Sequence, residues 1–192
     1  NATSLALKGL SINTTYYTRA IALFAGATSY SSESGYPLSS NSVVGIWHFE
    51  GDPADASGRG NTGTLVNGPT YTTGRFGQTL NFVSASSQYV TVADNSTVKL
   101  GANPFTISAW IKTTADGVIV DKENTGSPYQ FYRLSVSSGK VWGAASDCGT
   151  GGCGWGSTRN PVAGNTLVND GRWHYVTVRR LGALVTVYVD GV

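Results

Sequence analysis

Short apolar runs alternate with clusters of Gly, Asn, Asp and Ser from Val43 onward. In residues 105–112, FTISAWIK, apolar and polar side chains alternate, which places the apolar ones on one face of a β-strand. Comparable runs recur about every ten residues, a spacing typical of an all-β sandwich or jelly roll. The pattern predicts strands over residues 45–49, 78–82, 89–92, 105–112, 117–122, 131–135, 140–144, 173–180 and 183–189.

The first 36 residues have a looser pattern. Residues 16–24, YYTRAIALF, are rich in β-forming side chains, and Gly26 separates them from a second short strand expected at 27–34. The polar run 37–42, PLSSNS, is typical of a linker. We therefore expect one domain segment over residues 1–36, a linker over 37–42 and a second domain over 43–192.

Composition narrows the class of protein. The 192 residues are 40% hydrophobic and 11% aromatic, enough for a packed core, so a disordered chain is excluded. A net charge of +2 is too small for a nucleic-acid binder, and no apolar run reaches the ~18 residues of a membrane span. The low charged fraction, with abundant Ser, Thr, Gly and Tyr, favours an extracellular or cell-surface protein. Because the chain has no Met, we expect it to be processed or a piece of a longer protein.

Two cysteines, Cys148 and Cys153, flank a short Gly-rich loop, CGTGGC. Such a loop can bring the two sulfurs together, and a disulfide would indicate an oxidising compartment. A pair of free thiols is the alternative. Zinc is not expected, because the nearest His is His174, more than twenty residues further on.

The N-terminal segment carries a family resemblance. Leu10, Thr14 and Tyr16, followed by AGATSYSS, resemble the end of a fibronectin type III domain. In that family a Leu, a Thr and a Tyr with this spacing form a tyrosine corner before the penultimate strand. Ile12 stands where the family usually has Pro. The resemblance covers the last two strands only, so it implies a partial immunoglobulin-like segment.

Four ordered segments within residues 43–192 carry a more specific resemblance. They are GIWHFE with DASGRGNTGTL, GRFGQTLNF with SQYVTV, FTISAWIKT, and DGRWHYVTV with VTVYVDGV. Together they resemble a laminin-G-like domain of the concanavalin A-like lectin and glucanase superfamily. The resemblance implies an antiparallel jelly-roll β-sandwich, in which further strands normally follow YVDGV.

Most of the large rings at strand positions are expected in the core. These are Trp47, Phe49, Phe76, Phe82, Trp110 and Trp173. The two histidines, His48 and His174, lie beside Trp in predicted strands. No catalytic partner stands at a recognisable spacing from either, so both are expected to be structural.

Enzyme activity is not expected. Glucanases of the superfamily need two carboxylates facing each other across a cleft, and retaining members carry them in a Glu-x-Asp-x-x-Glu pattern that this chain lacks. Asp121 and Glu123 have the spacing of two carboxylates on one strand face, but we expect them in a solvated turn.

A calcium site is a candidate in the Gly-rich acidic segment 50–61, EGDPADASGRGN. Calcium takes oxygens from carboxylates, Asn side chains and carbonyl groups. Asp55 and Asn61 are the first candidate ligands, with Glu50 and Asp52 behind them. The alternative is an ordinary turn in which Asp55 accepts hydrogen bonds from Ser57 and Gly58.

A ligand site is expected in residues 145–165, which we interpret as a long loop. Trp155 offers a flat ring for a sugar, Arg159, Asp147 and Asn160 offer groups that bond hydroxyls, and Trp142 lies just upstream. The alternative is a loop that only covers a sheet edge or a neighbouring domain.

These inferences favour a non-catalytic extracellular binding module that recognises a glycan or a cell surface. Two alternatives stay open: a structural repeat of an adhesin or filament, joined to its own copies or neighbouring domains by strand addition, and a targeting module beside a glycoside hydrolase.

Overall fold

The computed structural model describes residues 23–25, 43–101, 103–124, 129–148 and 161–192. Its strands are β1 Leu23–Ala25, β2 Val43–Gly45, β3 Gly63–Val66, β4 Thr70–Thr73, β5 Gln78–Asn81, β6 Tyr89–Val92, β7 Phe105–Lys112, β8 Gly117–Asn124, β9 Tyr129–Ser137, β10 Lys140–Cys148, β11 Val162–Leu167, β12 Trp173–Leu181 and β13 Leu184–Val189. Two short 3₁₀ helices, η1 Ser84–Ser86 and η2 Ser96–Val98, flank β6. No helix among these described residues is long and apolar enough to cross a membrane.

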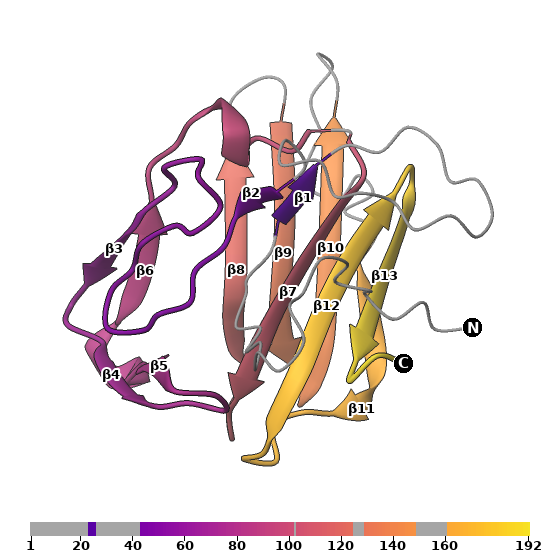
Figure 1. Ribbon diagram of the computed structural model, residues 1–192. Coiled ribbons are helices and arrows are strands. Elements are labelled where there is room, and N and C mark those ends of the chain that lie inside the picture. Colours follow the sequence, from indigo (N-terminus) through magenta and orange to yellow (C-terminus); the bar gives the residue numbers. More distant parts are fainter. Residues whose placement is uncertain (1–22, 26–42, 102, 125–128, 149–160) are drawn as a thin grey trace, which may run out of the picture.

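Two antiparallel sheets face each other (Figure 1). The five-stranded sheet has the order β13-β12-β7-β1-β2, and the four-stranded sheet has the order β11-β10-β9-β8. Two further pairs, β3 with β6 and β4 with β5, lie beside them. This arrangement confirms the predicted all-β antiparallel sandwich.

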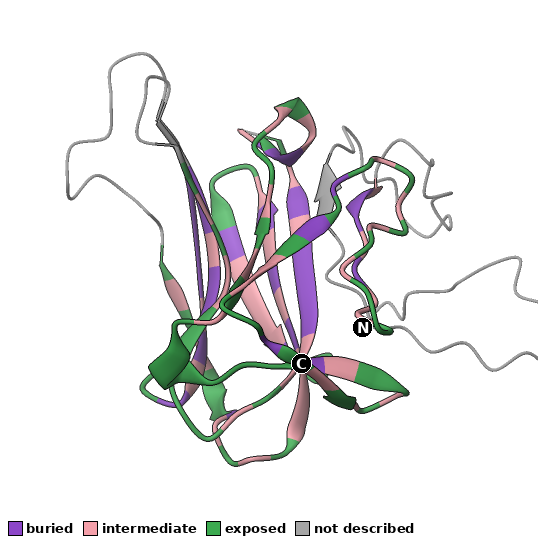
Figure 2. Ribbon diagram, turned by 90° about the vertical axis from the view of Figure 1, so that its left-hand side faces the viewer, coloured by how far each residue is buried: buried purple, intermediate pink, exposed green. Residues whose placement is uncertain are grey.

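The core lies between the two sheets. In β7 the alternating residues Phe105, Ile107 and Ala109 are buried, as the sequence pattern predicted. They pack in one cluster with Leu134 of β9 and Val141 of β10 from the opposite sheet. Figure 2 shows buried stretches on strands of both layers. Burial of this apolar surface is the main stabilising term of the fold.

The two sheets approach closely at Gly143 of β10. A Cβ added at this residue would lie 2.6 Å from Cγ2 of Val178 in β12 and 2.7 Å from Cγ1 of Val187 in β13. Gly164, in the neighbouring strand β11, has more room, because its nearest heavy atoms would be 3.6 Å from an added Cβ. Gly143 therefore sets how near the sheets can pack.

The β9–β10 hairpin has a turn at Ser138 and Gly139, whose φ angles are 51° and 74°. Two positive φ values match the type I′ turn that fits the twist of paired strands, and Gly tolerates them best. The Asp116 carboxylate accepts hydrogen bonds from both main-chain N–H groups, at 2.6 and 2.9 Å. This contact ties the turn to the start of β8.

Strand β1 comes from the segment that resembles a fibronectin type III domain. It pairs with β7 on one side and with β2 on the other, in the same sheet as the rest of the sandwich. The other residues of segment 1–42 lie outside the described residues. The domain boundary at 37–42 therefore stays a prediction.

Several predicted elements differ from the structure. Strands β3, β4 and β11 were not predicted, and β8, β9 and β10 run further than expected. The predicted loop 145–165 is wrong at both ends, since β10 continues to Cys148 and β11 begins at Val162.

The core prediction holds for some of the large rings. Trp47 is buried and Phe49 packs against the core. Phe82 is 47% exposed, so its predicted burial is wrong. Phe76, Trp110 and Trp173 are half-buried.

Candidate functional site

Asp55 organises the acidic segment 50–61. One oxygen of its carboxylate accepts hydrogen bonds from the N–H groups of Ile46, at 3.0 Å, and Ser57, at 2.8 Å. The other accepts from the Ser57 hydroxyl and from the N–H of Asn61, both at 2.8 Å. Burial raises the pKa of Asp55, but these hydrogen bonds outweigh it and leave the pKa below its usual value. The carboxylate thus accepts four hydrogen bonds, and these hold the turn together.

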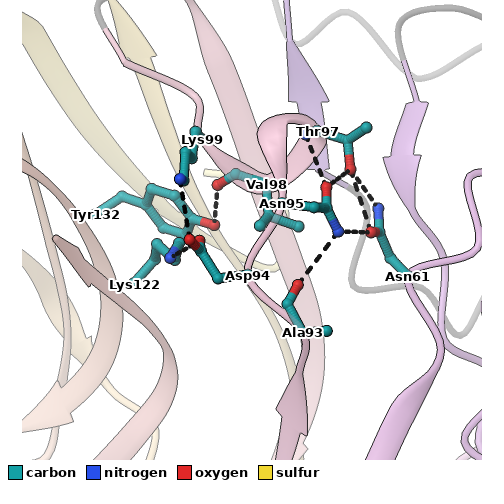
Figure 3. A network of polar contacts seen from close by, with 9 residues as sticks. All are labelled: Asn61, Ala93, Asp94, Asn95, Thr97, Val98, Lys99, Lys122 and Tyr132. Atoms are coloured by element: carbon teal, nitrogen blue, oxygen red, sulfur yellow. Dashed lines mark hydrogen bonds and ion pairs between the residues drawn. The ribbon is translucent and has the colours of Figure 1, made fainter.

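Asn61 is only 2% exposed and belongs to the same framework. Its amide nitrogen donates to the carbonyl of Val44, at 2.7 Å, and to the hydroxyl of Thr97, at 2.9 Å. Its side-chain oxygen accepts from the amide of Asn95, at 2.8 Å. Figure 3 shows the three polar side chains facing one another. The indole N–H of Trp47 donates to the Asn61 carbonyl, at 2.7 Å, so the network reaches the core.

Glu50 and Asp52 have hydrogen-bond partners other than those of the Asp55 carboxylate. Glu50 accepts a hydrogen bond from the N–H of Gln78, and Asp52 accepts one from the N–H of Ala54. Across the residues that the structure describes, no three His, Cys, Asp or Glu side chains are grouped to hold a metal ion. Each Asp55 oxygen already accepts two hydrogen bonds, which is the arrangement expected of the alternative, an ordinary turn. Calcium binding stays a prediction.

A second polar network joins the residues in and around η2 to strands β8 and β9 (Figure 3). Asp94 forms ion pairs with Lys122 and Lys99. The hydrogen bonds from Lys122 and then Lys99 hold the pKa of Asp94 below its usual value. Next to them, the buried hydroxyl of Tyr132 donates to the carbonyl of Val98, at 2.9 Å. Both networks are structural anchors, since their polar atoms bond one another.

The predicted ligand loop lies mostly outside the described residues. Trp155, Arg159, Asn160 and Cys153 belong to that part of the chain, so the disulfide and the loop site stay predictions. Asp147 and Cys148 lie at the end of β10. Trp142, also in β10, pairs with Ser135 on one side and Ala163 on the other. It is half-buried in the sheet.

Four side chains that were not predicted as a site form a cluster, which we call the aromatic platform: Arg75, Phe76, Trp110 and Tyr175. The rings of Trp110 and Tyr175 are 5.3 Å apart, and Phe76 meets Trp110 edge-on at 5.8 Å. The Arg75 guanidinium lies 5.0 Å from the Trp110 ring and 5.4 Å from the Phe76 ring. Arg75 is exposed and makes no ion pair with any described residue.

Strand pairing explains why the aromatic platform forms. Trp110 and Tyr175 are direct partners across the β7–β12 ladder. The turn between β4 and β5 then brings Arg75 and Phe76 over the end of β7 (Figure 1). Trp110 alternates with the core residues of β7, so it lies on the outer face of the five-stranded sheet, away from the second sheet.

Hydroxyl groups continue the outer face beyond the aromatic platform. Ser108 and Thr177 are the next outward residues of β7 and β12, and their hydroxyls lie 3.0 Å apart. Ser108 is buried and Thr177 is half-buried. Tyr188 of β13 pairs with Thr177. The outer face therefore combines aromatic rings, hydroxyls and a cation, as ligand sites with a few polar groups do.

His174 precedes Tyr175 in β12, so its side chain points to the opposite face of the sheet from the aromatic platform, and it has two carboxylate partners. Its Nδ1 is 2.8 Å from Asp190 and its Nε2 is 3.2 Å from Asp170. The sequence analysis found no partner for His174, and the structure supplies two carboxylates; the expected structural role stays a prediction. The missed signal is the β12–β13 register: Leu181 pairs with Leu184 and Val176 with Val189, so Asp190 falls opposite Tyr175.

A family model described as "Concanavalin A-like lectin/glucanases superfamily" matches residues 84–192, more than half of the chain. The chain belongs to this superfamily. No curated protein matches the chain. Among solved structures, the concanavalin A-like domain is similar to the "binding domain of Paraclostridial Mosquitocidal Protein 1", with a TM-score of 0.52 and 14% identity. The match covers 89% of this chain and 38% of that chain, and at this identity it shows the fold alone.

Within the concanavalin A-like domain, Asp121 and Glu123 lie inside strand β8, so the predicted solvated turn is wrong. Asp121 forms a two-pronged ion pair with Arg133 of β9, at 3.0 and 2.9 Å. Such a pair occupies both oxygens of the carboxylate. This contact gives Asp121 a role on the sheet surface.

Proposed function

We propose that this concanavalin A-like domain is a non-catalytic binding module of an extracellular protein and takes a glycan on the outer face of its five-stranded sheet. The observation that carries the proposal is the aromatic platform. A pyranose ring has an apolar face that stacks on aromatic rings, while its hydroxyls need donors and acceptors. Tyr175 and Trp110 supply the rings, and Arg75 supplies N–H donors.

The charge arrangement supports the same function. The Arg75 guanidinium lies over Trp110, so it is held in place without a carboxylate from the described residues. A planar guanidinium stacked on an aromatic ring keeps its edge N–H groups free for oxygen atoms of a ligand. The half-buried Thr177 hydroxyl, which bonds the buried Ser108, extends the polar contacts along the sheet.

The test is binding of the whole chain to three soluble polysaccharides: hydroxyethyl cellulose, xylan and chondroitin sulfate. We expect Tyr175→Ala and Arg75→Gln each to weaken binding about tenfold, equivalent to ~1.4 kcal/mol. Tyr89→Ala is the matched control, because Tyr89 is an exposed tyrosine of β6 that takes no part in the aromatic platform. Thermal midpoints of all variants check that they fold.

Two further measurements distinguish this site from the predicted loop site and test for calcium. If Trp155→Ala abolishes binding and Tyr175→Ala does not, the outer face is the wrong site. If EDTA weakens binding, calcium takes part, and Asp55 and Asn61 become the first ligands to test. If the folded chain binds none of the three polysaccharides, the glycan proposal fails.

Strand-mediated assembly is the second candidate function. Val118 on edge strand β8 is 59% exposed, and Leu184 on edge strand β13 is 65% exposed. Exposed edges with apolar side chains can accept a further strand from another chain. A concentration-dependent increase in mass, removed by Val118→Lys or Leu184→Lys, would favour this function.

A further inference from the structure

His174 is held between two carboxylates from separate parts of the chain. Asp170 lies in the turn before β12, and Asp190 follows β13. The His174 side chain is only 12% exposed. Its two ring nitrogens are therefore both occupied by oxygen atoms that can only accept hydrogen bonds when ionised.

This geometry selects a protonation state. A neutral imidazole has one N–H, whereas the imidazolium has two. Only the imidazolium can donate to Asp170 and Asp190 at the same time. The hydrogen bond to Asp190 raises the pKa of His174 above its usual value, burial opposes the rise, and the hydrogen bond to Asp170 adds to it.

Other charged groups lie around the pair of contacts. Arg172 donates its main-chain N–H to Asp170, at 2.9 Å, and its guanidinium is 3.8 Å from the same carboxylate. On the neighbouring strand β7, His174 pairs with the uncharged Ile111, and the next residue is Lys112. Arg172 contacts Asp170, and the Lys112 side chain alternates to the other face of β7, so the two carboxylates are the charged groups that retain the proton.

Asp190 also connects His174 to the aromatic platform. Its second carboxylate oxygen accepts a hydrogen bond from the N–H of Tyr175, at 2.8 Å. Its own N–H donates to the Tyr175 carbonyl, also at 2.8 Å. The Tyr175 ring then contacts Trp110. One carboxylate thus holds both the histidine and the backbone of a platform residue.

We propose that His174, Asp170 and Asp190 form a proton-operated clamp between the turn at residues 170–172 and the end of β13, closed at both contacts only while His174 is protonated. When His174 loses its proton to solvent, its remaining N–H keeps the shorter contact to Asp190. Its other nitrogen then presents a lone pair to Asp170, and the turn at residues 170–172 is released. An effect on glycan binding rests on the proposed function, whereas the clamp itself does not.

The clamp is tested by NMR titration of the whole chain without ligand. The chain has two histidines, so His48→Gln leaves His174 as the single imidazole signal. We expect His174 to titrate above pH 6.5, the usual midpoint, with the signal of the Arg172 amide, whose N–H donates to Asp170, shifting at the same midpoint. Asp170→Asn removes the negative charge of one partner and retains Asp190, so it should lower the His174 midpoint by about one pH unit.

Thermal melting gives a second reading. A raised folded pKa contributes stability that is present below about pH 6.5 and is lost as the pH rises through the folded value. The wild-type chain should therefore melt higher than His174→Gln at pH 6, and this difference should shrink by pH 9. A His174 midpoint at or below 6.5, or an Arg172 amide that does not follow it, would overturn the clamp. If His174 titrates above pH 6.5 as expected and the chain binds no polysaccharide, only the glycan proposal is overturned.

Discussion

Replacing Asp55 with Asn is expected to lower the free energy of unfolding by about 3 kcal/mol, a fall in the thermal midpoint of roughly 6 to 12 °C. The Asp55 carboxylate accepts four hydrogen bonds, two at each oxygen. An amide keeps one acceptor oxygen and turns an NH₂ group toward the donors of Ser57 and Asn61. Urea or thermal unfolding of the two chains measures the difference.

Asp52→Asn is the matched control, since Asp52 is exposed and accepts one local hydrogen bond. It should change stability by less than about 0.5 kcal/mol. The pKa of Asp55 is lower in the folded state, so its contribution is present above pH 3.8 and is lost as the pH falls through the folded value. Asp55→Asn should therefore flatten the acid side of the stability profile. Equal effects of the two substitutions would contradict the role assigned to Asp55.

Gly143→Ala is expected to cost about 2–3 kcal/mol, although it adds a single methyl group. The new Cβ would lie 2.6 Å from Val178 and 2.7 Å from Val187, well inside contact distance. Val178 is fully buried, and a branched side chain has few other rotamers in a strand. The two sheets would have to separate locally, and denaturant unfolding would report the loss.

Gly164→Ala is the control for this prediction. It places the same methyl group in the adjacent strand, where its nearest neighbours are 3.6 Å away. We expect its stability to stay within about 0.5 kcal/mol of the wild-type value. If Gly143→Ala is equally mild, the sheets are not in close contact at this point.

Local pattern was a good guide where a strand has one buried face. Residues 105–112 and 89–92 have the predicted bounds, because alternating burial imposes a two-residue period. Strands β4 and β11 lack that period: β4 is TYTT and β11 is VAGNTL, both mostly exposed. Their positions are set by hydrogen bonds to β5 and β10, which local pattern does not show.

The candidate site depends on long-range register. The acidic segment 50–61 was interpreted as either a calcium loop or a turn, and the described contacts of Asp55 match the turn. Trp110 meets Tyr175 only because β7 pairs with β12. That register depends on which strands are neighbours, so alternation within each strand cannot provide it. The Asp190 contact to His174 needs only the register of the β12–β13 hairpin, so it is the part of the site that could have been predicted from the sequence.

The pairing of β7 with β12 also governs when the protein can fold. Phe105 pairs with Arg180 and Lys112 with Trp173, so the partners are 61 to 75 residues apart along the chain. Closing so long a loop before any pairing is gained slows folding. During synthesis, β7 is complete well before β12 leaves the ribosome, and its edge stays open in the interval. Nascent chains are therefore most prone to aggregate at that stage, and chaperone capture should be strongest there.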